Sequence, residues 1–310
     1  MSVLICGSLA YDTIMVFEDR FKNHILPEQV HILNVSFMVP RLRREFGGCA
    51  GNIAYSLKLL GGDALPMGTV GVDFDPYAAW LRQNDIPLNH VTEISDTFTA
   101  QAYITTDLDD NQITAFHPGA MGFSHENRIG DARGVSLGIL SPDGRDGMLQ
   151  HAEQFDEAGI PFIFDPGQGL PMFNGRELTD FIDRATWVTA NDYESRLISE
   201  RTGLSPEQIA GRVEAYVITR GGEGSLVHTR KGAIEIPAAR ATEVQDPTGC
   251  GDAYRAGLLY GLAAGCDWEI TGRMASLMGA IKIECHGTQN HELDPDEFGE
   301  RFKEQFGFRI

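Results

Sequence analysis

Basic residues are scarce in this chain: 25 Lys and Arg stand against 44 Asp and Glu, a formal net charge of −19 over 310 residues. A nucleic acid or an anionic membrane surface binds a basic face, so we expect neither as a partner. No apolar run approaches the length that is needed to span a bilayer. The first residues, Met1 to Gly7, lack the basic region and the long apolar core of a signal peptide. We therefore expect a cytoplasmic protein.

Cysteine is also sparse, with five residues at scattered positions. Because the number is odd and the spacing irregular, we expect free thiols in a reducing cytosol and no disulfide framework. Cys49 and Cys250 lie inside glycine turns, but neither has a neighbouring His that would activate a thiol. We interpret both as small residues that fill tight turns.

Motifs of three common enzyme classes are missing as well. The chain has no Gly-x-x-x-x-Gly-Lys-Ser/Thr sequence, which excludes a Walker-type nucleotide hydrolase. No Gly-x-Gly-x-x-Gly opens a helix after the first predicted strand, which argues against a dinucleotide-dependent oxidoreductase. The nine histidines show neither a His-Glu-x-x-His spacing nor a Cys/His ligand pattern, so we do not expect a zinc site.

Short apolar runs that alternate with helical patterns make up most of the chain. Buried strands are predicted at residues 3–6, 64–72, 136–140, 162–165, 187–191, 216–219 and 225–228. Helical stretches such as 146–158 separate several of them. This alternation predicts an α/β fold with three layers (α/β/α), in which helices cover both faces of a mostly parallel sheet.

Two other segments mix apolar and polar residues in the way that half-exposed strands do. The first, within residues 11–46, includes a predicted strand at 31–39. The second, residues 97–116, has a turn at Asp109 to Asn111 and predicts a β-hairpin. We expect one unit over residues 1–310, divided into a core of 1–10, 43–96 and 119–310 and a small β-sheet lid of 11–42 and 97–118.

Polar clusters follow the predicted strands, which is where ligands bind in open parallel sheets. They are Asp165–Gln168, Asn191–Glu194, Thr219–Gly224 and Asp246–Asp252. Asn191 and Glu194 could hold a magnesium ion through its waters, or could simply begin a helix. The glycine loop at 219–224 could cover nucleotide phosphates, or could be a plain connection between strands.

Residues 246–252, Asp-Pro-Thr-Gly-Cys-Gly-Asp, have two glycines in a tight turn before a predicted helix. Backbone N–H groups at such a turn, together with the helix N-terminus, form a site for an anion, and we call these residues the anion turn. An aspartate in this place repels a phosphate but can deprotonate a hydroxyl that attacks it. Asp252 is equally suited to cap the helix, so the seven residues alone leave both roles open.

Together these elements are suited to phosphoryl transfer, which depends mainly on positioning and on neutralising charge. The chain offers an anion site, a carboxylate base beside it, an acid for magnesium, and a separate glycine turn at 47–52 for the acceptor. A lid that moves would exclude water and so prevent the hydrolysis of ATP.

The order and spacing of these motifs are similar to those of the ribokinase-like (PfkB) family of carbohydrate and nucleoside kinases, over almost the whole chain. Residues 46–62 resemble its N-terminal signature, residues 246–254 resemble its C-terminal one, and 7–12, 191–194 and 219–224 resemble further motifs. Within the family, the chain most closely resembles bacterial adenosine kinases of the mycobacterial type. The stretches that carry this similarity are 20–21, 26–28, 46–60, 112–121, 189–194 and 287–289.

The resemblance implies a ribokinase-like (Rossmann-like) core and the transfer of phosphate from Mg·ATP to the 5′-hydroxyl of adenosine, as in purine salvage. Asp252 would take the hydroxyl proton, while the amides of Gly249, Cys250 and Gly251 hold the γ-phosphate. The residues implied for Mg²⁺ and ATP are Asn191, Glu194, Thr219, Gly221, Gly222 and Gly224, with Glu194 acting on the metal through water. The family often binds a monovalent cation such as K⁺, for which Asp246 and Thr248 are the candidates here.

The resemblance also implies which residues bind the nucleoside. They are Ser8, Asp12, Ser36, Gly48, Asn52, Phe116 and Gln168. Asp12 would hold the ribose 2′ and 3′ hydroxyls, Phe116 would stack on the purine, and Gln168 would bond the edge of the base. Two departures bear on the base: Gly169 stands where the mycobacterial pattern has a second glutamine, and Ala102 stands at or near the place of a second aromatic.

Three alternatives therefore stay open. The enzyme could be a sugar kinase or a broader nucleoside kinase, since a diol-binding Asp12 would serve either. Outside catalysis, the chain could be a ligand-binding regulatory protein on the same fold. By analogy with the fold, an edge of the small sheet could also pair with a second chain to form a homodimer.

Overall fold

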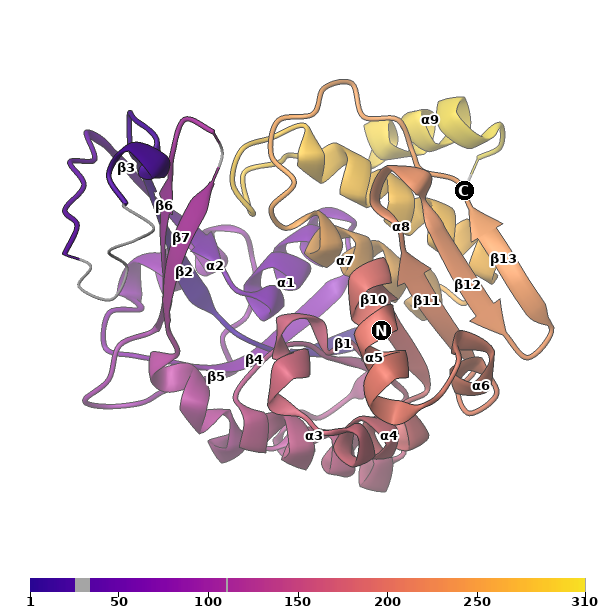
Figure 1. The fold of residues 1–310 in the computed structure, drawn as a ribbon. Helices are drawn as coiled ribbons and strands as arrows, with labels where there is room; N and C mark the ends of the chain where they lie inside the picture. The colour runs from indigo at the N-terminus through magenta and orange to yellow at the C-terminus, as the bar shows by residue number, and fades with distance from the viewer. Residues whose placement is uncertain (26–33, 110, 310) are drawn as a thin grey trace.

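The structure is a computed structural model, which describes residues 1–25, 34–109 and 111–309. The strands of its large sheet are β1 Ser2–Cys6, β4 Asp63–Val70, β5 His90–Glu93, β8 Val135–Leu140, β9 Phe162–Phe164, β10 Trp187–Asn191, β11 Ala215–Thr219, β12 Ser225–Thr229 and β13 Gly232–Ile236. Within the described residues they lie in the order β13-β12-β11-β10-β9-β8-β1-β4-β5 (Figure 1). Neighbours run parallel except β11 with β12 and β12 with β13. The predicted, mostly parallel sheet is confirmed.

The helices are α1 Cys49–Leu59, α2 Asp75–Gln83, α3 Arg145–Ala158, α4 Gly175–Arg184, α5 Asp192–Thr202, α6 Pro206–Ala210, α7 Cys250–Ala263, α8 Trp268–Ile283 and α9 Pro295–Phe306. Short 3₁₀ turns are η1 Phe21–Asn23, η3 Gly119–Glu126, η4 Ile129–Asp131, η5 Gly167–Met172 and η6 Gly221–Glu223. In the part of the chain that the structure describes, no helix combines the length and apolar character needed to cross a membrane.

Strand β1 shows how the sequence builds three layers, because successive side chains of a strand point to opposite faces. Val3 and Ile5 pack into one core with α1, α2, α7 and α8. Leu4 and Cys6 pack into a second core with α3, α4, α5 and α6. Figure 1 shows α1, α7 and α8 on one side of the sheet and α3 and α4 on the other. The predicted α/β/α arrangement is confirmed.

A second, smaller sheet stands beside the main body (Figure 1). Its strands are β2 Ala10–Val16, β3 Arg41–Gly47, β6 Ala100–Thr106 and β7 Gln112–His117, in the order β3-β2-β6-β7. Strands β6 and β7 form the predicted hairpin, and β2 runs parallel to β6. Pairing between the two half-exposed segments is therefore confirmed, and β7 is an edge strand whose residues are all exposed.

The prediction of a strand at residues 31–39 is wrong for those of its residues that the structure describes. Residues 34–39 form no strand, while residues 31–33, like the family-like stretch 26–28, lie outside the described residues. The second partner of β2 is β3, whose sequence Arg-Leu-Arg-Arg-Glu-Phe-Gly is rich in charge. The first four side chains of β3 are exposed, so the sequence of this strand shows little alternation of apolar and polar residues. Residues 41–47 are extended because they pair with β2.

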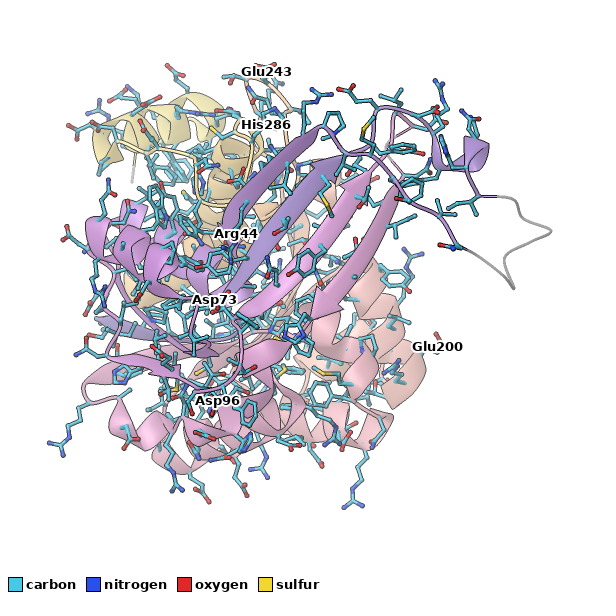
Figure 2. All side chains as sticks on the ribbon, turned by 90° about the vertical axis from the view of Figure 1, so that its left-hand side faces the viewer. Arg44, Asp73, Asp96, Glu200, Glu243 and His286 are labelled. Carbon is cyan, nitrogen blue, oxygen red and sulfur yellow. The ribbon has the colours of Figure 1, made fainter. Side chains whose placement is uncertain are left out.

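The small sheet is fastened to the main body at Asp73, in the loop before α2. The Asp73 carboxylate accepts a hydrogen bond from the Thr99 N–H at 2.8 Å, and the Asp73 carbonyl accepts one from the Tyr11 hydroxyl at 2.9 Å. The Arg44 guanidinium lies 3.4 Å from Asp73 Oδ2 and 3.5 Å from the centre of the Tyr11 ring. Figure 2 shows Arg44 and Asp73 close together beside the small sheet. One residue thus anchors β2, β3 and the segment that leads into β6.

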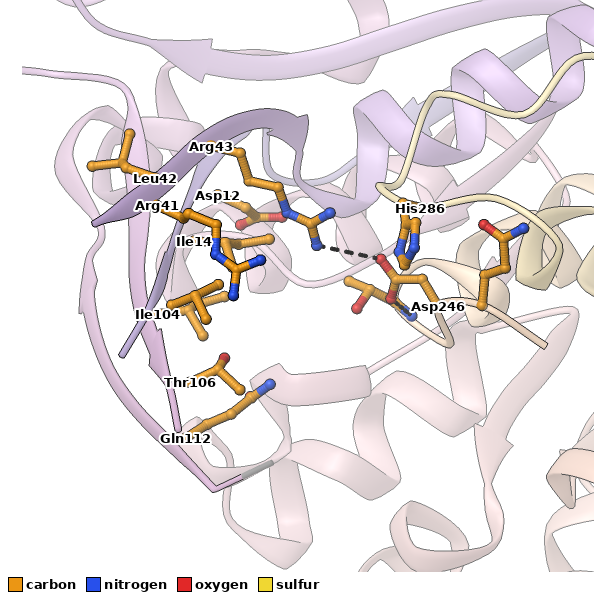
Figure 3. A pocket seen from close by; sticks show the side chains of 13 residues that line it. Asp12, Ile14, Arg41, Leu42, Arg43, Ile104, Thr106, Gln112, Asp246 and His286 are labelled. Atoms are coloured by element: carbon orange, nitrogen blue, oxygen red, sulfur yellow. Dashed lines mark hydrogen bonds and ion pairs between the residues drawn. The ribbon is translucent and has the colours of Figure 1, made fainter. Parts of the chain in front are cut away.

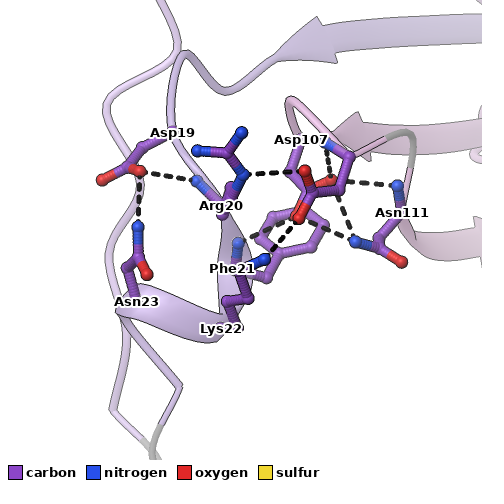
Figure 4. A network of polar contacts seen from close by, with 8 residues as sticks. Asp19, Arg20, Phe21, Lys22, Asn23, Asp107 and Asn111 are labelled. Carbon is purple, nitrogen blue, oxygen red and sulfur yellow. Dashed lines mark hydrogen bonds and ion pairs between the residues drawn. The ribbon is translucent and has the colours of Figure 1, made fainter.

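The far end of the hairpin is organised by Asp107, which is buried. Its carboxylate accepts hydrogen bonds from the N–H groups of Phe21, Asp109 and Asn111, each at 2.9 Å (Figure 4). Since Phe21 belongs to η1, the chain that follows β2 is tied to the turn between β6 and β7. The small sheet is therefore braced at both ends.

A substitution at Gly257, in α7, tests how closely this helix packs on α8. A Cβ atom at Gly257 would lie 2.5 Å from the Ala275 Cα, so the two helices would have to move apart. We expect Gly257→Ala to lower the free energy of unfolding by about 1–3 kcal/mol, measured by denaturant titration. In the control Gly299→Ala, in α9, the new Cβ would meet nothing within 4 Å, and we expect a gain of about 0.5–1 kcal/mol. Equal effects of the two substitutions would contradict this packing.

Candidate active site

Asn52 and Asp252 are 200 residues apart in the chain, and the fold brings their side chains into contact. Asn52 Nδ2 donates to Asp252 Oδ2 at 2.8 Å, and Gln289 Nε2 donates to Asn52 Oδ1 at 3.0 Å. The Asn52 amide is thereby fixed in orientation, because its nitrogen and its oxygen each have a partner. Among the described residues nothing donates to Asp252 Oδ1, which leaves that oxygen for a further partner.

Asp252 lies in the first turn of α7 but does not cap it. The N-cap is Gly249, so the helix-cap interpretation of Asp252 is wrong: its carboxylate is turned toward Asn52. Loss of surrounding water raises the pKa of Asp252 to about 6; the hydrogen bond from Asn52 opposes this rise, and the charge of Asp165 adds to it. A carboxylate with this pKa is ionised at neutral pH and is a stronger base than an ordinary Asp.

The anion turn presents backbone N–H groups toward the same place. Gly249 has φ of 79°, a left-handed conformation that favours glycine. The N–H of Cys250 is used within the turn, since it donates to the Pro247 carbonyl at 3.2 Å. The N–H groups of Gly251 and Asp252 have no acceptor among the described residues. The N–H of Gly249 likewise has no acceptor among these residues. These amides and the N-terminus of α7 therefore remain for an anion.

The turn into α1 brings backbone against Ser8 and Asp12. A Cβ on Gly47 would lie 2.5 Å from Asp12 Oδ2, and a Cβ on Gly48 would lie 2.5 Å from the Ser8 carbonyl oxygen. Ser8 is buried, and its Oγ accepts a hydrogen bond from the Cys49 N–H at 3.2 Å. Glycine at both positions lets the Asp12 carboxylate and the start of α1 approach each other.

A cavity of about 680 Å³ lies between the small sheet and the anion turn (Figure 3). Its lining residues are Asp12, Ile14, Val16, Arg41, Leu42, Arg43, Ile104, Thr106, Gln112, Gln245, Asp246, Thr248 and His286. Loss of water raises the pKa of Asp12 to about 6, and the charges of Glu45 and Asp246 add to that rise. Arg43 reaches toward the anion turn, with Nη2 3.8 Å from Asp246 Oδ2 (Figure 3). The cavity thus offers a carboxylate and apolar side chains to one ligand.

Of the seven residues predicted to bind the nucleoside, Asp12 alone lines this cavity. Ser8, Gly48 and Asn52 belong to the turn into α1 or contact it, and the remaining three lie elsewhere. Ser36 is exposed in the chain before β3, and Gln168 is exposed in η5. Phe116 stands on the edge strand β7 and is 52% exposed. The structure brings Asp12, Gly48, Asn52 and Asp252 together, but not these three.

Asn191 and Glu194 form a capping box at the start of α5, in agreement with the plainer of the two interpretations. Asn191 Oδ1 accepts from the Glu194 N–H and Glu194 Oε2 accepts from the Asn191 N–H, both at 2.8 Å. Burial raises the pKa of Glu194, the charge of Asp165 adds to the rise, and Arg255 opposes it. In the described ranges no group of three His, Cys, Asp or Glu side chains could hold a metal ion by itself.

The predicted nucleotide loop lies next to this capping box. Thr219 pairs with Asn191 where β11 and β10 end. Gly221 and Gly222 are exposed in η6, and a Cβ on either would meet nothing within 4 Å, so their backbone is open to a ligand. Gly224 differs, because a Cβ there would lie 2.1 Å from the Ile236 carbonyl oxygen.

The sequence patterns did not identify Arg255, one helical turn after Asp252. Its Nε and Nη2 donate to the two Asp165 oxygens at 3.2 and 2.9 Å, and both side chains are buried. This pair joins the loop after β9 to the second turn of α7. Asp165 was expected at a strand end, but its partner is 90 residues away in sequence. The sequence did contain one signal for a buried partner of Arg255, because this arginine is the one charged residue among the mostly small and apolar residues 253–259.

The chain is similar to known proteins over most of its length. The sequence profile described as "pfkB family carbohydrate kinase" matches residues 13–295. A nucleoside kinase of Burkholderia thailandensis, solved in complex with inosine, is 54% identical with a TM-score of 0.91 and covers 99% of both chains. Its structure in complex with ADP-inosine has a TM-score of 0.89 and 56% identity over 99% of this chain and 97% of that one.

Two more distant structures share the fold. The nucleoside kinase of Methanocaldococcus jannaschii is 30% identical, with a TM-score of 0.89, over 98% of this chain and 99% of its own. A ribokinase of Thermotoga maritima is only 19% identical, yet it superposes with a TM-score of 0.82 over 98% of this chain and 99% of its own. The ribokinase-like fold expected from the sequence is confirmed.

Removing Arg255 should be costly, because it would leave the buried Asp165 carboxylate without its partner. We expect Arg255→Met to lower the free energy of unfolding by about 3–5 kcal/mol in denaturant titration. The control is Arg184→Met, which breaks a more exposed ion pair with Asp156 at 3.0 Å and should cost about 1 kcal/mol or less. Similar losses in the two variants would show that the buried pair does not hold α7 to the loop after β9.

Proposed function

We propose that this chain, which belongs to the pfkB family of carbohydrate kinases, is a nucleoside kinase. It would transfer the γ-phosphate of ATP to the 5′-hydroxyl of a purine nucleoside, giving the nucleoside 5′-monophosphate and ADP. The observation that supports this most is the hydrogen bond between Asn52 and Asp252, which lies beside the open amides of the anion turn. The nucleoside kinases to which the chain is similar support the same class of acceptor.

In the proposed reaction Asp252 is the general base. Asn52 holds Asp252 Oδ2. Asp252 Oδ1 would therefore accept the proton of the 5′-hydroxyl while the 5′ oxygen of the nucleoside attacks the γ-phosphorus of ATP. The N–H groups of Gly251 and Asp252, at the N-terminus of α7, would stabilise the charge on the transferred phosphoryl group. The bond between phosphorus and the ADP oxygen breaks as the new one forms, and ADP leaves with that electron pair.

The nucleotide would lie along the carboxyl ends of β10 and β11, against the open backbone of Gly221 and Gly222. Mg²⁺ bound with ATP would neutralise phosphate charge. Magnesium usually keeps several waters and takes one or two carboxylates plus substrate phosphates, and a single Glu194 fits that demand. Because one Glu194 oxygen caps α5, the other is the one that would reach the metal's waters.

The ribose would lie in the cavity with its vicinal hydroxyls on Asp12, since a carboxylate accepts from both. The apolar side chains of Ile14, Val16 and Ile104 would face the rest of the nucleoside. We propose that residues 11–42 and 97–118 act as a lid, whose movement toward the anion turn would carry Phe116 to the base. The exposed edge β7 is also where a second copy could add to the small sheet.

The proposed base range is wider than adenosine alone. By the family resemblance Phe116 and Gln168 favour a purine, but Gly169 supplies no second side chain for the base edge. Inosine and adenosine differ at that edge, so a site with few polar contacts there would accept both. Both reactions belong to purine salvage.

A panel of acceptors tests the proposed substrate class. We expect ATP consumption with adenosine, inosine and guanosine at kcat/KM values within about tenfold of one another, because a hydrogen bond at the base edge contributes only about 0.5–1.5 kcal/mol. Ribose and fructose, which lack a base, should be poor acceptors. Faster turnover of either sugar than of every nucleoside would contradict the proposal.

Asp252→Asn tests the base. The variant is nearly isosteric and uncharged, so we expect nucleoside binding to persist while kcat falls by about 10²–10⁴-fold. Asp180→Asn, at an exposed position of α4, is the control and should leave kcat unchanged. A kcat like that of the wild type in Asp252→Asn would remove Asp252 from this role.

The pH dependence of kcat gives an independent test. Asp252 acts only when it is deprotonated, and its pKa is raised to about 6. Activity should therefore be full well above pH 6 and should fall as the pH drops through that value. A profile that stays flat down to the ordinary range of an Asp, about pH 4, would contradict the raised pKa.

A further inference from the structure

Lys282, in α8, is completely buried, although lysine is among the residues least often found inside a protein. Its Nζ donates to the Asp246 carbonyl oxygen at 2.9 Å and to the Cys285 carbonyl oxygen at 3.1 Å. No described carboxylate lies within ion-pair distance of Nζ. The ammonium is therefore held by backbone carbonyl groups, as a small cation would be.

These two carbonyls belong to segments that face each other across the base of the anion turn. The N–H groups of Gln245 and Asp246 both donate to the Ile283 carbonyl, at 2.9 and 3.2 Å. The N–H of Gly287 donates to Asp246 Oδ2 at 3.0 Å. The anion turn thus docks on the loop after α8, and the Lys282 ammonium lies at the junction.

A charge in this place has an electrostatic consequence for the site. Burial lowers the pKa of Lys282, while the negative charge of Asp246 opposes that shift and favours the charged form. A positive charge behind the turn acts in the same direction as the N-terminus of α7, toward any anion bound at the turn.

We propose that the Lys282 ammonium is a positioning residue that serves as a built-in monovalent cation for the anion turn. The protein would then need no metal cation at Asp246 and Thr248, where the family resemblance suggested K⁺. The Asp246 carboxylate is already engaged, because it accepts from the N–H groups of Thr248 and Gly287. This inference rests on the proposed kinase function and concerns how that site is charged.

The test compares the wild type with Lys282→Met, whose side chain ends about one atom short of Nζ and leaves room for an ion. Kinase activity is measured with inosine and Mg·ATP in a tetramethylammonium buffer while K⁺ or NH₄⁺ replaces that cation at constant ionic strength. We expect the wild type to be insensitive to K⁺. We expect Lys282→Met to lose about tenfold or more in kcat, less than the roughly 10²–10³-fold cost of losing a direct oxyanion donor, and to recover with K⁺ or NH₄⁺.

The control is Lys303→Met, at an exposed position of α9, which should behave like the wild type. Strong K⁺ activation of the wild type would overturn the proposal, because a metal cation would then be needed beside Lys282. A loss in Lys282→Met that neither K⁺ nor NH₄⁺ restores would also overturn it and would make Lys282 a structural contact. If Lys282→Met does not fold, Lys282→Gln replaces it, and its activity must likewise fall without K⁺ and recover when K⁺ or NH₄⁺ is added.

Thermal unfolding without any substrate separates this inference from the proposed function. We expect the Tm of Lys282→Met to rise as K⁺ replaces tetramethylammonium, while the wild type and Lys303→Met do not respond. A wild type that phosphorylates no nucleoside would defeat the proposed function alone. A K⁺-insensitive Tm in Lys282→Met would count against the built-in cation, whatever the substrate proves to be.

Discussion

The hydrogen bond between Asn52 and Asp252 is the contact on which the rest of the site depends. It can form only if α1 and α7 begin at the same place on one face of the sheet, which is what their shared core provides. Glycine at positions 47 and 48 allows the approach on the α1 side, and glycine at 249 turns the chain into α7. Gln289 then fixes the Asn52 amide, so that one oxygen of Asp252 is held and the other is left for a substrate. Preorganisation of this kind is what phosphoryl transfer requires from a protein.

Charge is the second constraint, because an acidic chain must bind an anionic nucleotide. The fold meets it locally, with backbone amides at the anion turn and with buried cations beneath it. Arg255 neutralises Asp165 close to the base, and Lys282 places a positive charge behind the turn. Both cations sit on α7 or α8, whose close packing at Gly257 keeps them in position. The stability of this helix pair and the electrostatics of the site are therefore coupled.

Local patterns in the sequence were sufficient for the strands of the main sheet from β12 to β4 and for the glycine turns, because both signals lie within a few residues. They were insufficient for β3, where exposed arginines hide the alternation, and for the small edge strands β5 and β13. The start of α4 carried a usable signal, since Asn174 and Glu177 form a capping box that could have been recognised. Arg255, Lys282 and Gln289 could not be assigned in this way, because their partners lie 36 or more residues away or depend on packing. Phe116, Gln168 and Ser36 came from family resemblance, and their place around a bound nucleoside stays a prediction.

The central claim is that a phosphoryl group passes from ATP to one defined oxygen of a nucleoside. It is tested most directly by ³¹P NMR of the products formed from ATP and inosine. We expect one phosphomonoester on the 5′ carbon, formed in equal amount with ADP and with no free phosphate beyond the enzyme-free control. ADP that appears with inorganic phosphate, or a phosphoryl group on the 2′ or 3′ oxygen, would contradict the arrangement of Asp12, Asp252 and the anion turn described above.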